Sequence, residues 1–341
     1  MKAAVLSGTK DLSLKDVPIP KIAEDEALVR VQSCGLCGTD IHAYEGDFMP
    51  QYLPLILGHE FSGDIVELGS KVKNFKIGDR VTVSPEIYCH SCENCRKGSN
   101  RICLDWDSIG TSVDGAFAEY IKVRKDCLHH LPESISYDVG ALLEPAACVY
   151  CGIRQVPEYF DKRVLIMGAG SIGLLWLTLL RSRNPLVLDM IDVDDDKLAF
   201  AQSLGADSVF NTKDAKDSYY DVIKKKYDVV VDCTGVPSVI ERGFTVVDRE
   251  GTVIFFGVAP TQAKINISPY DIYIDSIKVV GVFPDMRSFG TIIDMLDKKI
   301  VDFSPLISHR FPLSEFEKGF EFFKGSSVGR TKVMIYNDYI K

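Results

Sequence analysis

Three glycines, at positions 168, 170 and 173, restrict the fold of this chain more than any other feature. They form the turn Gly-Ala-Gly-Ser-Ile-Gly, which follows an apolar segment at 164–167 and precedes an apolar run at 172–180. The first segment predicts a buried strand and the second a buried helix. In this context the glycines let backbone N–H groups at the helix N-terminus approach a pyrophosphate. A glycine-rich turn without a ligand is the competing interpretation, and the flanking strand and helix argue against it.

The second half of the chain continues this rhythm of apolar strands and amphipathic helices. Six strands connected mostly by helices predict a doubly wound parallel sheet. The segments that we expect to form these strands are 164–167, 186–191, 208–210, 228–232, 252–256 and 278–282.

The first 131 residues have a different hydrophobic pattern. Short apolar alternations at 27–31, 63–68, 80–83 and 116–123 are broken by glycine, proline and charged turns, which predicts a β-rich, barrel-like domain. A helical run at 142–150 leads out of it. We expect the tail after residue 283 to form helices near 289–296 and 316–323 and a strand at 332–335, and to pack back on the first domain because it is too small to stand alone. The expected domains are therefore 1–150, completed by 284–341, and 151–283.

Composition excludes several classes of protein. The chain has 341 residues, 46% of them hydrophobic, and 39 basic against 48 acidic residues, for a net charge of −9. This balance argues against nucleic acid or an anionic membrane as a partner. We find neither a signal peptide nor about 18 uninterrupted apolar residues, so we expect a cytoplasmic protein. Ten cysteines in that compartment suggest metal binding or simple burial rather than disulfides.

Four of the cysteines are closely spaced in a polar loop. They follow the pattern C-x2-C-x2-C-x7-C and are Cys89, Cys92, Cys95 and Cys103. Because the residues between them are too polar for a core, we predict a closed structural zinc site with four thiolate ligands. An iron–sulfur cluster is less favoured because the bacterial cluster run places its fourth cysteine after three residues and before proline. A reduced loop without metal is the remaining alternative.

A second set of possible metal ligands lies in two short segments. Cys37 begins Cys-Gly-Thr-Asp-Ile-His, which ends at His42, and His59 and Glu60 follow Gly58. A thiolate, an imidazole and a carboxylate are all zinc ligands, and a catalytic zinc keeps one position open for water or substrate. Glu144 is a distant candidate to complete such a site. Taken alone, a histidine between glycine and glutamate is just as consistent with a surface residue.

Asp192 bears on the choice of dinucleotide. It ends the second predicted strand, about 20 residues after the glycine turn, where an acidic residue binds the ribose hydroxyl groups. Asp194, Asp195 and Asp196 follow it, and no arginine precedes the next helix. A 2′-phosphate would be repelled there, so the sequence favours NAD over NADP.

Together these motifs resemble the zinc-dependent medium-chain dehydrogenases over essentially the whole chain, in the family's order and spacing. The resemblance implies a GroES-like catalytic domain joined to a Rossmann domain. It also implies catalytic zinc at Cys37, His59 and Glu144, with Glu60 as a ligand or an exchangeable carboxylate beside the metal. Thr39 and His42 would form a proton path. The positions that touch the dinucleotide in relatives are Gly168, Gly170, Ile172, Gly173, Asp192, Lys197, Val258 and Phe283.

Glutamate at position 144 resembles the polyol dehydrogenase branch of the family, typified by sorbitol dehydrogenase. Two departures concern substrate: Ala43 replaces a usual tyrosine, and Pro284-Asp285 replaces an Arg-Tyr pair. We therefore expect NAD-linked, reversible oxidation of a secondary hydroxyl of some other polyol, or of a sugar-alcohol phosphate held by Arg287 or a lysine, to a ketose.

The alternatives are a threonine-type or primary-alcohol dehydrogenase and, from another class, a non-catalytic zinc or nucleic-acid-binding module. The acidic balance and the dinucleotide motif oppose the last of these. Relatives are dimers or tetramers, which implies a homo-oligomer.

Overall fold

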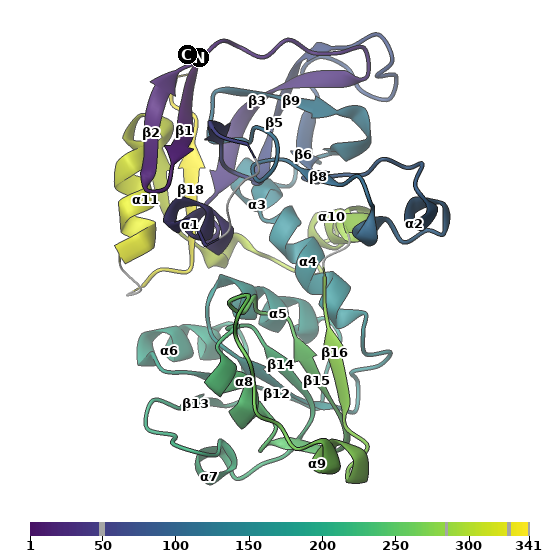
Figure 1. Cartoon of the computed structure of the whole chain (residues 1–341), viewed down its shortest axis with the longest axis vertical. Helices are drawn as coiled ribbons and strands as arrows, with labels where there is room; N and C mark the ends of the chain where they lie inside the picture. Colours follow the sequence, from purple (N-terminus) through teal and green to yellow (C-terminus); the bar gives the residue numbers. More distant parts are fainter. Residues whose placement is uncertain (48–51, 284–285, 326–328, 340–341) are drawn as a thin grey trace. The chain divides into compact units, whose positions relative to one another are not determined.

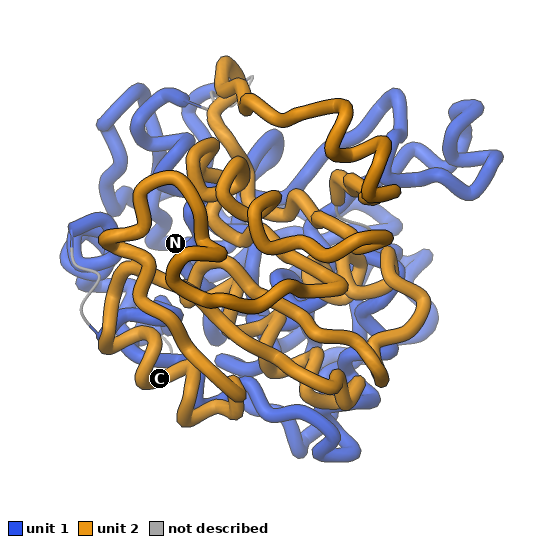
Figure 2. Tube along the Cα trace, turned by 90° about the horizontal axis from the view of Figure 1, so that it is seen from below, with its two compact units in different colours: residues 1–147, 285–341 blue, residues 148–284 orange. Residues whose placement is uncertain are grey.

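The computed structural model describes residues 1–47, 52–283, 286–325 and 329–339 (Figure 1). The chain divides into two compact units, drawn in different colours in Figure 2. Unit 1 comprises residues 1–147 and 285–341, and unit 2 comprises residues 148–284. The N-terminal and C-terminal segments of the sequence therefore share one unit, and the glycine turn lies in the other.

Unit 1 is built on β-sheets. Its strands are β1 (Lys2–Gly8), β2 (Asp11–Asp16), β3 (Glu26–Gly35), β4 (Leu55–Ile56), β5 (Glu60–Leu68), β6 (Arg80–Val83), β7 (Glu86–Ile87), β8 (Asp107–Ser108), β9 (Tyr120–Arg124), β10 (Leu128–His130), β17 (Ile307–Pro312) and β18 (Lys332–Tyr336). The largest sheet has the order β10-β6-β5-β3-β18-β17, with β9 also paired to β3. Two smaller sheets have the orders β2-β1-β4 and β7-β8.

The helices of unit 1 are short. They are α1 (Gly38–Glu45), α2 (Glu93–Arg96), α3 (Tyr137–Ala141), α10 (Phe289–Asp297) and α11 (Phe316–Gly325). A longer helix, α4 (Leu143–Ile153), starts in unit 1 and continues into unit 2. The core of unit 1 consists of the apolar residues that alternate along the strands, such as Val29 and Val31 of β3 and Ile65 of β5, with Phe316 and Phe320 of α11. In β3, buried Val29 and Val31 alternate with the partly exposed Arg30 and Gln32, as expected where a strand turns one face to the core.

Strand pairing brings distant segments together at Gly35. On one side Gly35 pairs with Glu60 of β5, and on the other it pairs with Met334 of β18. Residues near the start of the chain, near position 60 and near the C-terminus therefore become neighbours. This arrangement determines which charged groups surround the first candidate metal site.

Unit 2 contains one six-stranded parallel sheet. Its strands are β11 (Arg163–Met167), β12 (Val187–Asp192), β13 (Val209–Asn211), β14 (Tyr227–Asp232), β15 (Val247–Phe255) and β16 (Lys278–Gly281), in the order β13-β12-β11-β14-β15-β16. Its helices are α5 (Ser171–Arg181), α6 (Asp195–Ser203), α7 (Tyr220–Ile223), α8 (Pro237–Gly243) and α9 (Pro269–Ile274). The order reverses at β11, which is the doubly wound arrangement of dinucleotide-binding sheets.

The predicted fold class is confirmed: a β-rich unit accompanies a doubly wound parallel sheet. Five of the six predicted strands in unit 2 agree with the structure within one residue at each end. The exception is β15, which begins at Val247 instead of residue 252. The tail forms α10, α11 and β18 as expected, and β18 pairs with β3.

The structure also forms α1 directly after Cys37, where the sequence showed no obvious long helix. None of the helices in the described ranges is both long enough and apolar enough to cross a membrane.

Candidate metal and dinucleotide sites

Cys37, His59 and Glu60 come together in unit 1. Cys37 is the residue before α1, and His59 and Glu60 lie where β5 begins. One ligand atom from each, a thiol sulfur, a ring nitrogen and a carboxylate oxygen, lies within 4.8 Å of the others. His59 and Glu60 are buried, whereas Cys37 is partly exposed. The fold thus converges three ligand types that zinc accepts, as expected from the two segments.

Asp40 orients this group. Its Oδ2 accepts a hydrogen bond of 2.9 Å from the backbone N–H of Cys37, and its Oδ1 lies 3.8 Å from Nδ1 of His59. Burial raises the pKa of Asp40 to about 6, although the nearby His59 opposes this shift. A carboxylate beside a ligating histidine fixes the ring orientation and makes the ring a better metal ligand. An acidic residue in the first helical turn is a common capping signal, so the sequence did contain a hint of this role.

Charges around His59 favour its protonated form when no metal is present. Burial lowers the pKa of the ring, but the Cys37 thiolate and the Asp40 and Glu144 carboxylates raise it, and overall the pKa lies well above its ordinary value. These three negative groups create a strongly negative potential at one point. A divalent cation, which is much the stronger positive charge, fits the same surroundings.

Lys332 is the main residue that sequence analysis missed. Its ammonium group forms an ion pair with Oε2 of Glu60, and the two side chains are only 4% and 1% exposed. Burial lowers the pKa of Lys332, whereas Glu60 and Cys37 raise it, and the net shift is upward. Nothing in the sequence around a lysine at the start of a strand indicates this partner. The pairing of β18 with β3 and of β3 with β5 is what creates it.

Glu144 lies near this site but outside the 4.8 Å group of ligand atoms found among the described residues. It is buried near the start of α4. Its charge nevertheless acts on both His59 and Lys332, since it raises the pKa of each. Glu60 and Glu144 therefore both act on His59 and Lys332, from different elements.

Thr39 and His42 lie on α1, next to Cys37. The hydroxyl of Thr39 is 3.6 Å from the Cys37 sulfur. The His42 ring is 52% exposed, and its Nδ1 is 3.5 Å from a carboxylate oxygen of Asp47. One of the two predicted proton-path residues thus faces the sulfur, and the other faces solvent.

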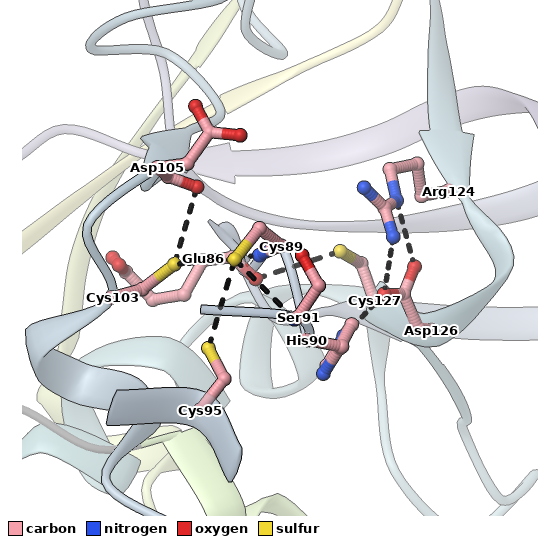
Figure 3. A network of polar contacts seen from close by, with 10 residues as sticks. All are labelled: Glu86, Cys89, His90, Ser91, Cys95, Cys103, Asp105, Arg124, Asp126 and Cys127. Carbon is pink, nitrogen blue, oxygen red and sulfur yellow. Dashed lines mark hydrogen bonds and ion pairs between the residues drawn. The ribbon is translucent and has the colours of Figure 1, made fainter. Parts of the chain in front are cut away.

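The four cysteines of the 89–103 loop also converge. Figure 3 shows three of them, Cys89, Cys95 and Cys103. The Sγ of Cys89 is 4.0 Å from that of Cys95 and 3.4 Å from that of Cys103, and the Cys92 and Cys103 sulfurs are 4.0 Å apart. Tetrahedral zinc with Zn–S bonds of about 2.3 Å requires sulfurs about 3.8 Å apart, so the residues fit this metal. The backbone N–H groups of Ser91 and Cys92 help lower the pKa of the Cys89 thiol to about 6, which favours the ligating thiolate.

In unit 2 the glycine turn has the geometry of a phosphate-binding loop. Gly168 has φ +102°, in the left-handed region, and a Cβ on Gly173 would overlap the backbone oxygen of Gly168. The fold itself therefore requires these two glycines. Gly170 is different, because its φ is −76° and a Cβ there would meet no protein atom within 4 Å. An open space beside the N-terminus of an eleven-residue helix fits a bound pyrophosphate.

Asp192 is the last residue of β12, beside this turn. Its carboxylate accepts hydrogen bonds of 2.7 Å from the backbone N–H groups of Ala169 and Val193. The other expected contacts also follow the carboxyl ends of strands or start helices: Ile172 is on α5, Lys197 on α6, Val258 follows β15 and Phe283 follows β16. Val258 is 84% exposed and Phe283 is 55% exposed. Exposed apolar side chains at this edge are available to contact a ligand.

The sequence departs from sorbitol dehydrogenase at Ala43 and at the Pro284-Asp285 pair. Ala43 is buried on α1. Pro284 and Asp285 lie outside the described residues, so the predicted departure at these positions stays a prediction.

Two family models match the chain. The alcohol dehydrogenase GroES-like domain matches residues 23–133, in unit 1. The zinc-binding dehydrogenase model matches residues 171–298, which include most of the parallel sheet.

Similar proteins cover nearly the whole chain. D-altritol 5-dehydrogenase of Agrobacterium fabrum is 37% identical over 89% of this chain and 90% of its own length. Sorbitol dehydrogenase of Bacillus subtilis is 31% identical over 98% and 97%. The crystal structure of a zinc-binding dehydrogenase from Sinorhizobium meliloti bound to NADP superposes with a TM-score of 0.92 at 31% identity, covering 98% of both chains. The chain therefore belongs to the zinc-dependent medium-chain alcohol dehydrogenase family, in its polyol dehydrogenase-like branch.

Proposed function

We propose that this chain catalyses the reversible, NAD-linked oxidation of a secondary hydroxyl group of a polyol to a ketone. The observation that carries the proposal is the convergence of Cys37, His59 and Glu60 within 4.8 Å in a dehydrogenase fold. Similarity to enzymes named for D-altritol and sorbitol supports a substrate with several hydroxyl groups.

Cys37 and His59 would hold the catalytic zinc, with a carboxylate as third ligand. Glu60 and Glu144 are the two candidates. The Lys332 ammonium competes with a metal for Glu60, so Glu60 can exchange between the two positive charges. Zinc, when bound, supplies a Lewis acid that lowers the pKa of a hydroxyl group near it. The four cysteines at 89, 92, 95 and 103 would hold a second, structural zinc.

Thr39 and His42 would carry the proton away from the substrate. Thr39 lies beside Cys37, where its hydroxyl can accept the proton of the substrate hydroxyl and donate its own. The His42 ring can then take the proton and release it to solvent, because half of its surface is exposed and Asp47 lies close enough to pair with it. A hydroxyl followed by an imidazole is a chemically competent relay at neutral pH.

The surroundings of Asp192 support NAD as the cofactor. When bound, the dinucleotide supplies the hydride acceptor. Asp192 is fixed by the backbone N–H groups of Ala169, in the glycine turn, and of Asp194, and Asp195 follows closely. These carboxylates would accept hydrogen bonds from ribose hydroxyls and repel a 2′-phosphate. A related structure holds NADP, so cofactor choice must be measured on this chain.

We also propose that the chain forms a homodimer or homotetramer through β16. This strand is at the edge of the six-stranded sheet and is largely exposed, and Tyr273 and Ile274 of the preceding α9 are exposed as well. An exposed strand edge flanked by apolar side chains is a pairing surface. Light scattering on the purified protein would decide the state, and a monomer at micromolar concentration would contradict the proposal.

A cytoplasmic location is proposed from the cysteines. All ten cysteines are free thiols in the structure. Reducing compartments preserve thiols in this state. Fractionation of the native cells, followed by detection of the protein, would test this.

The function is tested by a substrate panel with metal quantification. With NAD, we expect turnover of one or more polyols or polyol phosphates to exceed turnover of threonine and ethanol, with about two zinc per chain. Cys37→Ser should abolish turnover while NAD binding remains. Cys148→Ser, on the partly exposed part of α4, is the matched control and should stay active. Near-normal activity of Cys37→Ser would refute the catalytic site.

A further inference from the structure

One polar cluster of unit 1 plays no part in the ligand set or the proton path. It consists of Glu86 of β7, and Trp106 and Ser108 at β8. The indole N–H of Trp106 donates to Oε2 of Glu86, and the hydroxyl of Ser108 donates to Oε1 over 3.3 Å. Glu86 and Ser108 are also paired across the two strands. The carboxylate is thus held in one orientation by two donors.

Backbone packing fixes this cluster against the segment that carries His59. The backbone N–H of Ile109 donates to the oxygen of Pro85 over 2.9 Å, which ties the strand ends together. Beyond β8, the N–H of Ala116 donates to the oxygen of Gly58 over 2.8 Å. Gly110 and Gly115 press on the backbone of Gly58 so closely that a Cβ on either would overlap its oxygen. Gly58 directly precedes His59, so the cluster is anchored to the metal-ligand segment itself.

Electrostatics support the same proximity. Burial raises the pKa of Glu86, and the hydrogen bonds from Trp106 and Ser108, followed by the charge of His59, oppose that shift. Glu86 is therefore a partly buried acid that senses the charge of His59. Burying a carboxylate costs free energy unless its oxygens accept hydrogen bonds. An ionised carboxylate offers about four lone-pair sites, so two donors leave part of its hydrogen-bonding capacity unused.

We propose that Glu86 is a substrate-recognition residue whose carboxylate, oriented by Trp106 and Ser108, accepts a hydrogen bond from a polyol hydroxyl that is not oxidised. The proposal rests on the polyol oxidation proposed above and adds the group that distinguishes polyhydric from monohydric alcohols. When a polyol moves from water into a binding site, its hydroxyl groups that are not oxidised need hydrogen-bond acceptors from the protein. A site with such an acceptor discriminates against analogues that lack the hydroxyl.

A purely structural role makes a different prediction. β7 and β8 flank the four-cysteine loop, and the Cys127 thiol donates to the backbone oxygen of Glu86 over 3.7 Å (Figure 3). If Glu86 only held the two ends of this loop together, its replacement would lower the zinc content or the stability of the protein. All substrates would then be affected alike.

The experiment compares kcat/KM for the best polyol with kcat/KM for 2-butanol, a monohydric secondary alcohol, with NAD. Glu86→Gln keeps the shape but removes the charge, and we expect about a 10-fold loss for the polyol, mainly in KM, with 2-butanol unchanged. Glu67→Gln, an exposed glutamate on β5, is the matched control and should change neither. Trp106→Phe and Ser108→Ala each remove one hydrogen-bond donor to Glu86. Both should lower the ratio of kcat/KM for the polyol to kcat/KM for 2-butanol, and they provide the test if Glu86→Gln does not fold.

The recognition role would be overturned if Glu86→Gln left the ratio of kcat/KM for the polyol to kcat/KM for 2-butanol unchanged. Loss of one zinc per chain in this variant would overturn it as well. Failure of the proposed function is a separate result, because the unmodified enzyme would then oxidise no polyol. In that case the ratio is zero before any substitution is made.

Discussion

Lys332 and Glu60 form a buried ion pair beside the candidate catalytic metal site, although they are far apart in the sequence. Gly35 makes room for it, since a Cβ there would overlap the Glu60 carboxylate and approach the Lys332 side chain. The pair thus depends on three neighbouring strands, β5, β3 and β18. It places a positive charge directly on the Glu60 carboxylate in the absence of a metal.

Lys332→Met should therefore destabilise the metal-free protein. Removing one partner of a buried ion pair leaves an uncompensated charge, which costs about 3–5 kcal/mol. Zinc should restore part of the loss, because it can take up the Glu60 carboxylate. The measurement is urea unfolding with and without zinc. Lys122→Met, which breaks the more exposed pair with Glu26, should cost under about 1 kcal/mol, and an equal loss in both variants would contradict the prediction.

Gly170→Ala and Gly173→Ala should separate ligand binding from folding. The added methyl at Gly170 meets no protein atom, so the melting temperature should hold while NAD binding weakens at least about 10-fold, since the methyl would occupy the pyrophosphate space. At Gly173 the methyl overlaps the Gly168 backbone, so stability should fall by about 1–3 kcal/mol. Calorimetry with NAD and thermal unfolding provide the two readouts. Equal NAD affinity in Gly170→Ala and the unmodified protein would argue against this binding site.

Asp192→Asn should relax the preference for NAD. The amide keeps one of the two oxygens that accept the backbone N–H groups of Ala169 and Val193, and it removes the charge that repels a 2′-phosphate. We expect the ratio of kcat/KM with NADP to that with NAD to rise about 10-fold. Asp217→Asn, an exposed aspartate of unit 2, removes the same charge elsewhere and should leave the ratio unchanged. A shift of equal size in both variants would point to general charge instead of Asp192.

Cys95→Ser should remove the structural zinc. The loop that carries the four cysteines has no buried residues in α2, so metal ligation is its main source of order. We expect zinc to fall from about two to about one per chain, with a lower melting temperature. Ser91→Ala lies in the same loop and should keep both ions. Unchanged metal content in Cys95→Ser would exclude the four-thiolate site.

His129 should make the protein less stable as the pH falls. Burial lowers the pKa of its ring from about 6.5 to about 4, and the ring stacks on Phe289. The unfolded chain takes up a proton below pH 6.5 that the folded protein accepts only near pH 4, so stability decreases through this range, by up to about 3 kcal/mol.

His129→Gln should flatten this part of the pH profile, measured by urea unfolding between pH 7 and pH 4.5. His130→Gln is the control, because that ring is 60% exposed. Parallel profiles for His129→Gln and the unmodified protein would show that the buried ring does not contribute.

Local patterns in the sequence were sufficient for much of the fold and for two of the ligand sets. The glycine turn between an apolar strand and an apolar helix predicted the parallel sheet. Residues adjacent in the sequence determine the conformation of such a turn, so the sequence alone was enough to recognise it. The spacing of Cys89, Cys92, Cys95 and Cys103 predicted convergence for the same reason, since short connections keep four sulfurs within reach of one ion. Cys37, His59 and Glu60 were identified as ligand types, and resemblance to a family supplied their grouping.

Tertiary structure alone decided which charges surround those ligands. Lys332 meets Glu60 only because β18 pairs with β3 and β3 pairs with β5, and strand pairing between distant segments leaves no local pattern. Gly110 and Gly115 pack against Gly58, and this long-range contact brings the segment that follows Ser108 to the segment that carries His59. Sequence by itself determined the elements and the chemistry they carry, whereas long-range packing determined the electrostatic surroundings, since charge interactions depend on distance in space and not along the chain.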